Sequence, residues 1–195
     1  MVSLIGRFMR DLPYLREGQV PKRDSAQEVD ELDYTGEEHE KLTDQDVKDL
    51  SDALVDNNAF SGNIELNKND LTDLSALYLA QVFEKTSGQN IKKLKLDENN
   101  FTTKAGEYIG GALSANPSYP LKKLSFAKMS LESIGMVRVV EACNLNQNIT
   151  SLNLGIVTNE GLARLAELLR ENTSLESLAF EETDDHQKYW TGESR

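Results

Sequence analysis

An apolar residue recurs every 26 to 30 positions through most of this 195-residue chain. The recurrence is clearest at Leu50, Leu79, Ile109, Val139 and Leu165, which are 29, 30, 30 and 26 residues apart. A period in this range is typical of stacked repeats, in which each unit buries its apolar face against its neighbours. The sequence therefore predicts a solenoid, a shape that presents an extended surface.

Each unit contains one stretch with the pattern of an amphipathic helix. Two more apolar columns lie eight residues before and four residues after the first column, which places all three on one helical face. Thr43 is predicted to cap the first of these helices, because the acidic residue Asp46 follows it in the first turn. The two columns consist of Leu42, Leu71, Phe101, Leu131 and Val157, and of Leu54, Phe83, Leu113, Cys143 and Leu169.

The other half of each unit is a short stretch in which apolar and polar residues alternate, as in a half-buried strand. A degenerate copy of this pattern occupies Val29–Tyr34, which brings the predicted total to six strands and five helices. Strands that alternate with helices predict a parallel sheet on one side and helices on the other. The apolar pairs are Ile64 and Leu66, Leu94 and Leu96, Leu124 and Phe126, Leu152 and Leu154, and Leu178 and Phe180.

These residues resemble leucine-rich repeats, over roughly residues 29–180. The motif is carried by Leu94-Lys-Leu96-Asp-Glu-Asn99-Asn-Phe101, with further copies at 121–126 and 149–154. The long, helix-bearing unit is similar to the ribonuclease-inhibitor-like subclass. The resemblance implies an α/β leucine-rich-repeat solenoid of about five to six repeats, with a short parallel β-sheet on the concave side and α-helices on the convex side. The family also implies that the concave side binds partners.

The chain divides into three predicted regions. Residues 1–28 form an amphipathic helix, which Pro13 kinks or ends, and a linker; residues 29–180 form the repeat domain. Three roles are open for the helix: a cap on the first repeat, a partner-binding helix, or a mitochondrial or membrane-surface segment. Residues 181–195 form a polar tail containing Tyr189 and Trp190, whose rings either fold back as a cap or insert into another protein.

Charge is concentrated at the first repeat. The net charge is −12, and residues 29–60 hold 11 acidic and 2 basic side chains. Overall acidity excludes nonspecific nucleic-acid binding, because phosphate contacts need a basic surface. The acidic first unit has two interpretations, a docking surface for a basic partner or a terminal repeat kept soluble by charge.

The outward residues of the predicted strands are the candidate partner-binding site. Lys93 and Lys123 occupy matching positions in adjacent units, and with Lys95 they form a basic pad in an acidic molecule. The pad is interpreted either as an anchor for an acidic partner segment or as a solvated sheet face with neighbouring acids as counter-ions. The complete candidate set is Lys93, Lys95, Lys123, Glu65, Asn67, Asp97, Ser125, Asn153 and Trp190.

No pattern of a catalytic, cofactor or metal site is recognised. The two histidines have no companion at metal-ligand spacing, and the single cysteine, Cys143, excludes a paired-cysteine zinc site. Cys143 falls in an apolar column and is expected to be a small buried hydrophobe. The sequence therefore predicts a protein that is not an enzyme and has no cofactor.

The predicted function is a non-catalytic protein–protein interaction module, an adaptor or structural subunit of a larger assembly with another protein as partner. The resemblance leaves two alternatives, a tropomodulin-like or axonemal cytoskeletal protein and a small-GTPase regulator. We expect no transmembrane segment and a cytoplasmic location, with cytoskeletal or mitochondrial association as the alternatives.

Overall fold

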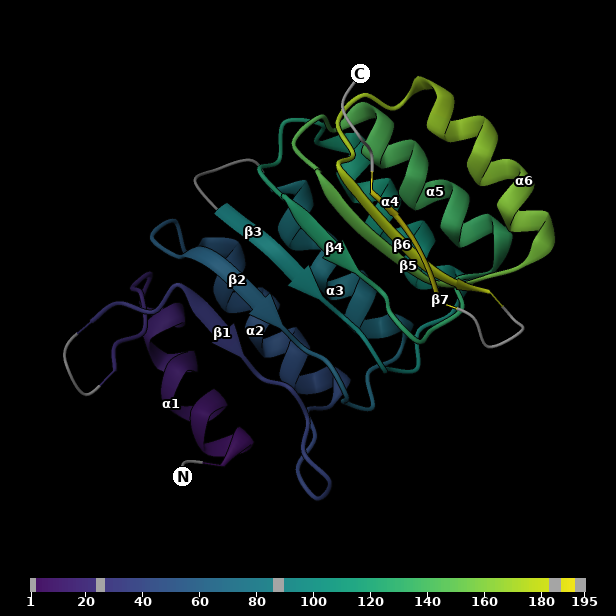
Figure 1. The fold of residues 1–195 in the computed structure, drawn as a ribbon. Helices are drawn as coiled ribbons and strands as arrows, with labels where there is room; N and C mark the ends of the chain where they lie inside the picture. Colours follow the sequence, from purple (N-terminus) through teal and green to yellow (C-terminus); the bar gives the residue numbers. More distant parts are fainter. Residues whose placement is uncertain (1–2, 24–26, 86–89, 183–186, 192–195) are drawn as a thin grey trace.

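The computed structural model describes residues 3–23, 27–85, 90–182 and 187–191. Its strands form a single sheet in the order β1-β2-β3-β4-β5-β6-β7, and helices α2 to α6 lie along one face of that sheet (Figure 1). The strands are β1 (Glu31–Asp33), β2 (Ser61–Glu65), β3 (Asn90–Lys95), β4 (Lys123–Ser125), β5 (Ser151–Val157), β6 (Ser177–Glu182) and β7 (Gln187–Thr191).

The helices alternate with the strands, which confirms the predicted α/β solenoid. Each repeat helix precedes the strand of the next unit and stacks on the helix before it. The helices are α1 (Leu4–Arg16), α2 (Asp44–Asp56), α3 (Asp73–Glu84), α4 (Thr103–Ala115), α5 (Glu132–Leu145) and α6 (Asn159–Leu168), and a short 3-10 turn, η1 (Leu169–Glu171), follows α6.

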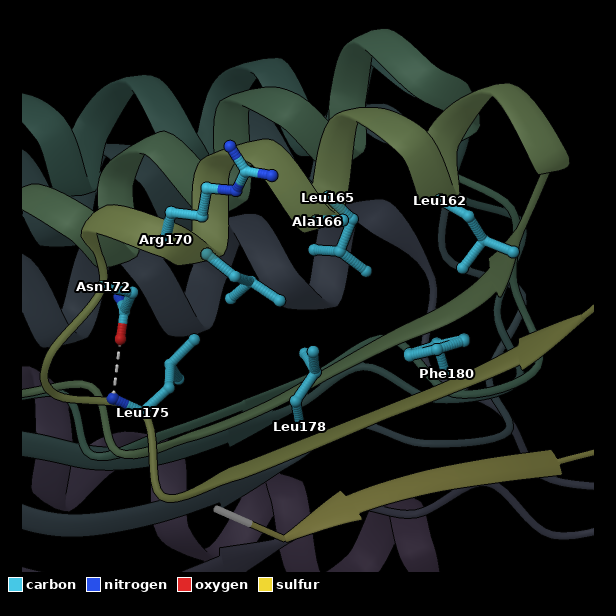
Figure 2. Close-up of a pocket in the computed structure, with 9 residues that line it drawn as sticks. Leu162, Leu165, Ala166, Arg170, Asn172, Leu175, Leu178 and Phe180 are labelled. Carbon is cyan, nitrogen blue, oxygen red and sulfur yellow. Dashed lines mark hydrogen bonds between the residues drawn. The ribbon is translucent and has the colours of Figure 1, made fainter. Parts of the chain in front are cut away.

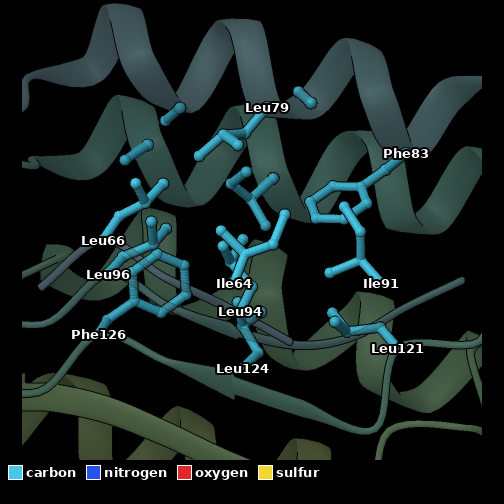
Figure 3. Close-up of a cluster of buried hydrophobic side chains, with 14 of the residues drawn as sticks. Ile64, Leu66, Leu79, Phe83, Ile91, Leu94, Leu96, Leu121, Leu124 and Phe126 are labelled. Atoms are coloured by element: carbon cyan, nitrogen blue, oxygen red, sulfur yellow. The ribbon is translucent and has the colours of Figure 1, made fainter. Parts of the chain in front are cut away.

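Strands β1 to β6 are parallel, and their register follows the repeat. Leu32, Ile64, Leu94, Leu124 and Leu152 are aligned from strand to strand, and each is at most 1% exposed. Figure 3 shows Ile64, Leu94 and Leu124 of this row on the side of the sheet that faces Leu79 and Phe83 of α3. The buried row explains the alternation, because every second strand residue faces the helix layer. Cys143 lies in the same core and is fully buried, as predicted.

Side chains of one unit cap the helix of the next. Thr43 caps α2 as predicted, and the structure adds that Thr43 and Asp46 form a reciprocal capping box. Asp44, in the first turn of α2, also accepts hydrogen bonds from the backbone N–H and hydroxyl of Thr72, the N-cap of α3. Asp73 does the same for Thr102 at the start of α4. Helix N-termini have unpaired N–H groups, so these carboxylates stabilise both the helix and the stacking.

Buried asparagines bridge adjacent units on both sides of the core. The turn residue Asn69 accepts from the N–H of Leu42 and donates to the carbonyls of Tyr34 and Leu66. At the other end of the helices, Asn146 donates to the carbonyl of Tyr119. A buried amide that satisfies otherwise unpaired backbone groups avoids their desolvation cost. The stacking therefore depends on polar ladders as well as on apolar columns.

Helix α1 shares the core of the first repeat. Leu4, Phe8, Leu12 and Leu15 are at most 4% exposed, and α1 packs against α2. The helix does not end at Pro13, because Pro13 lies on its exposed side, where the carbonyl left without a partner can face water. The division into residues 1–28, 29–180 and 181–195 stays a prediction.

The tail adds a strand that the sequence pattern did not predict. Residues 187–191 form β7, which pairs antiparallel with β6, so the sheet has seven strands in the described part of the chain rather than six. The backbone therefore folds back on the last repeat. The tail lacks clean alternation, and β7 forms because β6 offers a free edge. The side chains of Tyr189 and Trp190 lie outside the described set, so their role stays a prediction.

Candidate functional site

The strand register brings the predicted lysine pad together. Lys93 and Lys123 are Cα partners across β3 and β4, and Lys95 is the partner of Ser125. The next strands continue these two rows with Ser151 and Asn153. All six side chains lie on the sheet face opposite the helices, because they alternate with the buried leucines. The spacing of the pad was predictable, since it follows directly from the repeat.

Two of the three lysines are paired with acids of the preceding strands. The Glu65 carboxylate contacts Lys93 Nζ and lies 3.1 Å from Lys95 Nζ. Lys93 also lies 3.4 Å from Glu31 Oε1. Glu31 was absent from the predicted site, although it stands one residue before the buried Leu32 of the degenerate strand. Lys93 and Lys95 therefore agree with the interpretation in which neighbouring acids act as counter-ions to the lysines.

These ion pairs change the acid–base properties of the partners. Partial burial raises the pKa of Glu65, but hydrogen bonds from Lys93 and Lys95 outweigh burial, and the net pKa is lowered. Burial lowers the pKa of Lys93, but the hydrogen bonds that Lys93 donates to Glu65 and Glu31 outweigh burial, and the net pKa is raised. Both shifts favour the charged forms, so Glu65 and Lys93 stay ionised near neutral pH.

Lys123 differs from the other two lysines. Its side chain is exposed, and no ion pair to it occurs among residues 3–23, 27–85, 90–182 and 187–191. It borders a hollow of about 190 Å³ on the concave face. The hollow exists because β5 and β6 present small side chains, and its polar lining includes Lys95, Lys123, Ser125, Ser151, Asn153 and Ser177.

The remaining predicted residues are engaged within the fold. Asp97 accepts hydrogen bonds from the Ser125 hydroxyl at 2.6 Å and from the N–H of Ala127 at 2.8 Å. Asn67 accepts from the N–H of Asp97, and Asn153 accepts from the N–H of Gly155. These bonds fix the strand ends, and Asp97 positions the hydroxyl of Ser125, which lines the hollow. Trp190 belongs to β7, and its side chain lies outside the described set.

Several acids of the first unit have partners within the molecule. Asp49 pairs with Arg16 of α1 at 3.3 Å, and Glu37 lies 3.7 Å from Arg7. Asp44 caps the neighbouring helix, and hydrogen bonds from Ser75 and Thr72 outweigh partial burial and lower its pKa. Much of this charge therefore attaches α1 and α3 to α2.

A second surface was missed by reasoning from the sequence. An apolar groove of about 430 Å³ lies between α6 and β6, at the C-terminal end of the solenoid (Figure 2). Figure 2 shows leucines of α6 pointing toward Leu175, Leu178 and Phe180 across the groove. The available signal was that the last repeat carries a full set of apolar columns with no further unit to cover them.

The described part of the chain contains no group of three or more His, Cys, Asp or Glu side chains placed to hold a metal ion. No described helix combines the length and the apolar character needed to cross a membrane.

Comparison with known proteins identifies the fold. No protein-family model matches the chain, and no curated protein sequence matches it. Among solved structures, "Leiomodin-1 Actin-Binding Site 2 (ABS2)" is similar, with a TM-score of 0.64 and 19% sequence identity. The match covers 85% of this chain and 88% of that chain. At this identity the likeness shows the fold alone, and it supports the predicted leucine-rich-repeat architecture.

Proposed function

We propose that the chain is a non-catalytic protein-interaction module, whose concave face binds an extended, acidic segment of another protein. The observation that carries this proposal is the hollow beside Lys123, in which an exposed cation with no ion pair to any described residue adjoins hydroxyl and amide groups. Lysine and hydroxyl donors suit a carboxylate-bearing segment, because each can donate a hydrogen bond to a carboxylate oxygen.

The chemistry of the face favours modest affinity. Exposed ion pairs contribute only about 0–1 kcal/mol each. The residues that line the hollow include no aromatic side chain, and aromatic residues are enriched where a few contacts dominate binding. Binding is therefore expected to depend on salt, and Lys93 and Lys95, already paired with Glu65, contribute less than Lys123.

Charge reversal tests this surface. We expect Lys123→Glu to weaken the binding of a fluorescent, acidic, extended probe peptide more than Lys93→Glu does, with anisotropy as the readout. Lys104→Glu is the matched control, because Lys104 lies in α4, in the helix layer, and the change alters net charge equally. Equal weakening by Lys104→Glu and Lys123→Glu would show that only net charge matters and would refute the concave site.

The second candidate function is binding to actin as part of a cytoskeletal assembly. It is favoured by the similarity to the leiomodin structure, whose title names an actin-binding site and whose length the match nearly spans. Co-sedimentation with filamentous actin, together with a pyrene-actin polymerisation assay, tests it. The candidate fails if the protein stays in the supernatant and leaves polymerisation unchanged.

We also infer that the repeats belong to the ribonuclease-inhibitor-like subclass. Units of 26 to 30 residues, each with an α-helix on the convex side, support this assignment.

A further inference from the structure

We propose that the groove between α6 and β6 binds an amphipathic α-helix of a partner protein, and that this helix carries an acidic residue against Arg170. The surface is separate from the hollow on the concave face, since the two share no lining residue. The proposal concerns a second contact of the same module and does not rest on the concave site.

The groove consists of core positions that lack their next neighbour. Leu162, Leu175 and Phe180 are only partly buried, although they pack against the core. The residues at matching positions of the preceding unit are Met136, Ile149 and Leu154, and each is at most 2% exposed. In that unit α6 and β6 provide the cover. The groove is therefore the stacking face of a repeat, exposed where the repeats stop.

The strand layer of this face is already occupied. Strand β7 pairs with β6 over five residue pairs, from Ser177 and Thr191 to Glu181 and Gln187. An added strand thus has no free edge on β6. The helix layer has no such cover in the described part of the chain, where α6 packs on α5 and meets the open groove on its other side. What the array lacks here is a helix rather than a strand.

The other end of the molecule shows how such a face is closed. There α1 lies beside α2 and buries Leu4, Phe8, Leu12 and Leu15, which are spaced by three and four residues. This is the apolar stripe that an amphipathic helix presents to a core. A helix with the same apolar spacing suits the α6 groove, because the groove is also lined mainly by apolar side chains.

Charge specifies the partner further. Arg170 lines the groove, its side chain is exposed, and no described side chain forms an ion pair with it. Figure 2 shows its guanidinium beside the helix, above the leucine-lined floor. An acidic residue at the border of the partner's stripe would meet this group. A second copy of the chain is disfavoured, because each copy carries a net charge of −12 and already buries its own α1 stripe.

Synthetic helical peptides test the proposal. The probe has leucines every three or four residues and glutamates along one border of the stripe; a second version has lysines there, and a third is scrambled. With fluorescence anisotropy, we expect the full-length protein to bind the glutamate probe and to bind the scrambled peptide at least about tenfold more weakly. Absence of binding to the glutamate probe would overturn the proposal.

Three variants locate the binding. Ala166→Glu places a charge in the groove at an exposed position. It should weaken binding of the glutamate probe at least about tenfold. Ala163→Glu is the matched control, since Ala163 is exposed on the same helix but does not line the groove. Arg170→Glu should invert the preference, so that the lysine probe binds more tightly than the glutamate probe.

Each opposite result counts against the proposal. Equal effects of Ala166→Glu and Ala163→Glu would show that the probe binds outside the groove. If the Arg170→Glu variant still preferred the glutamate probe to the lysine probe, the proposed contact between Arg170 and an acidic residue would be refuted. Light scattering on the free protein adds a further arm. A dimer that Ala166→Glu dissociates would show that a second copy fills the groove. Lys123→Glu should leave the helical probe unaffected, which separates this result from a failure of the concave site.

Discussion

The two ends of the solenoid are built from the same repeat but finished differently. At the N-terminal end, α1 covers α2, and Asp11 is fully buried among Arg10, Arg23 and Tyr34. Asn57 adds hydrogen bonds from the end of α2 to the carbonyls of Leu15 and Gln19. At the C-terminal end, β7 extends the sheet, but the described residues leave an apolar groove beside α6.

This difference shows what a stack of repeats requires. Each repeat gains stability from the neighbours on its two sides. A terminal repeat therefore lacks the contacts of one side unless another segment covers it. The first repeat is covered by α1 of its own chain, and the hydrogen bonds and ion pairs of Asp11, together with the hydrogen bonds of Asn57, hold α1 in place. The contacts of Asp11 are the polar lock of α1. The last repeat obtains cover for its strand alone. We therefore expect the N-terminal end to be the more stable and the C-terminal end to be the one that accepts a partner.

The largest expected effect on stability comes from matched leucines in the first and last repeat helices, α2 and α6. Leu50 of α2 and Leu165 of α6 occupy the same column, and both are at most 2% exposed. Leu50→Ala should reduce the free energy of unfolding by about 3–5 kcal/mol, because it leaves a cavity in a closed core. Leu165 borders the groove, where water can fill the space, so Leu165→Ala should cost about 2 kcal/mol.

Urea denaturation monitored by circular dichroism measures both values. Equal losses of unfolding free energy for Leu50→Ala and Leu165→Ala would mean that the two ends are equally closed, which would contradict the proposed difference between them.

A smaller effect is expected from the polar lock of α1. Asp11 accepts from Arg23 at 2.8 Å and from the Tyr34 hydroxyl at 3.2 Å. Removing one partner of a buried ion pair leaves the other charge uncompensated, but both arginines are about one-third exposed and can reach water. We expect Asp11→Ala to cost about 2–3 kcal/mol, measured by urea denaturation.

The control for Asp11→Ala is Glu17→Ala, at the exposed end of the same helix, with an expected change of about 0.5 kcal/mol or less. A loss of this small size in Asp11→Ala would show that apolar packing alone holds α1.

The smallest effect concerns alkaline pH. Burial raises the pKa of Tyr34 well above its ordinary value of 10.0, and the charge of Asp11 raises it further. The folded state keeps a proton that the unfolded state releases, so this contribution to stability is present below about pH 10 and is lost as pH rises above it. Tyr34→Phe should therefore lose less stability than the parent protein between pH 9 and pH 11.

Parallel stability curves for Tyr34→Phe and the parent protein would contradict the assigned cause. Burial also raises the pKa of the Cys143 thiol, to about 12, but that group is present in both proteins and cancels in the comparison.

Most of the fold could be predicted from the sequence, because the apolar columns alone determine which face of each helix and strand is buried. The pairing of Lys93 with Lys123 followed for the same reason, since matching positions in adjacent repeats become strand neighbours. Asn146 stands where Asn116 and Asn172 stand in the adjacent repeats, and its role in stacking agrees with this repeated position. Periodicity thus predicts whatever is set by the repeat itself.

The missed features depend on contacts outside the repeat. The pairing of Glu65 with two lysines depends on the side-chain rotamers of neighbouring strands. The polar lock of α1 joins residues of α1 and of the linker to Tyr34, the residue that follows β1. Strand β7 has no repeat pattern and forms on the free edge of β6. The groove is the part of the last repeat that β7 leaves uncovered.

Native-state hydrogen exchange tests the central comparison most directly, because it measures the opening free energy of each helix in the same molecule. We predict that the amides of α2 exchange with opening free energies close to the global free energy of unfolding, while the amides of α6 exchange through a local opening of much lower free energy. Adding the glutamate probe should slow exchange in α6 and leave α2 unchanged. Equal protection of α2 and α6 in the free protein would contradict the account.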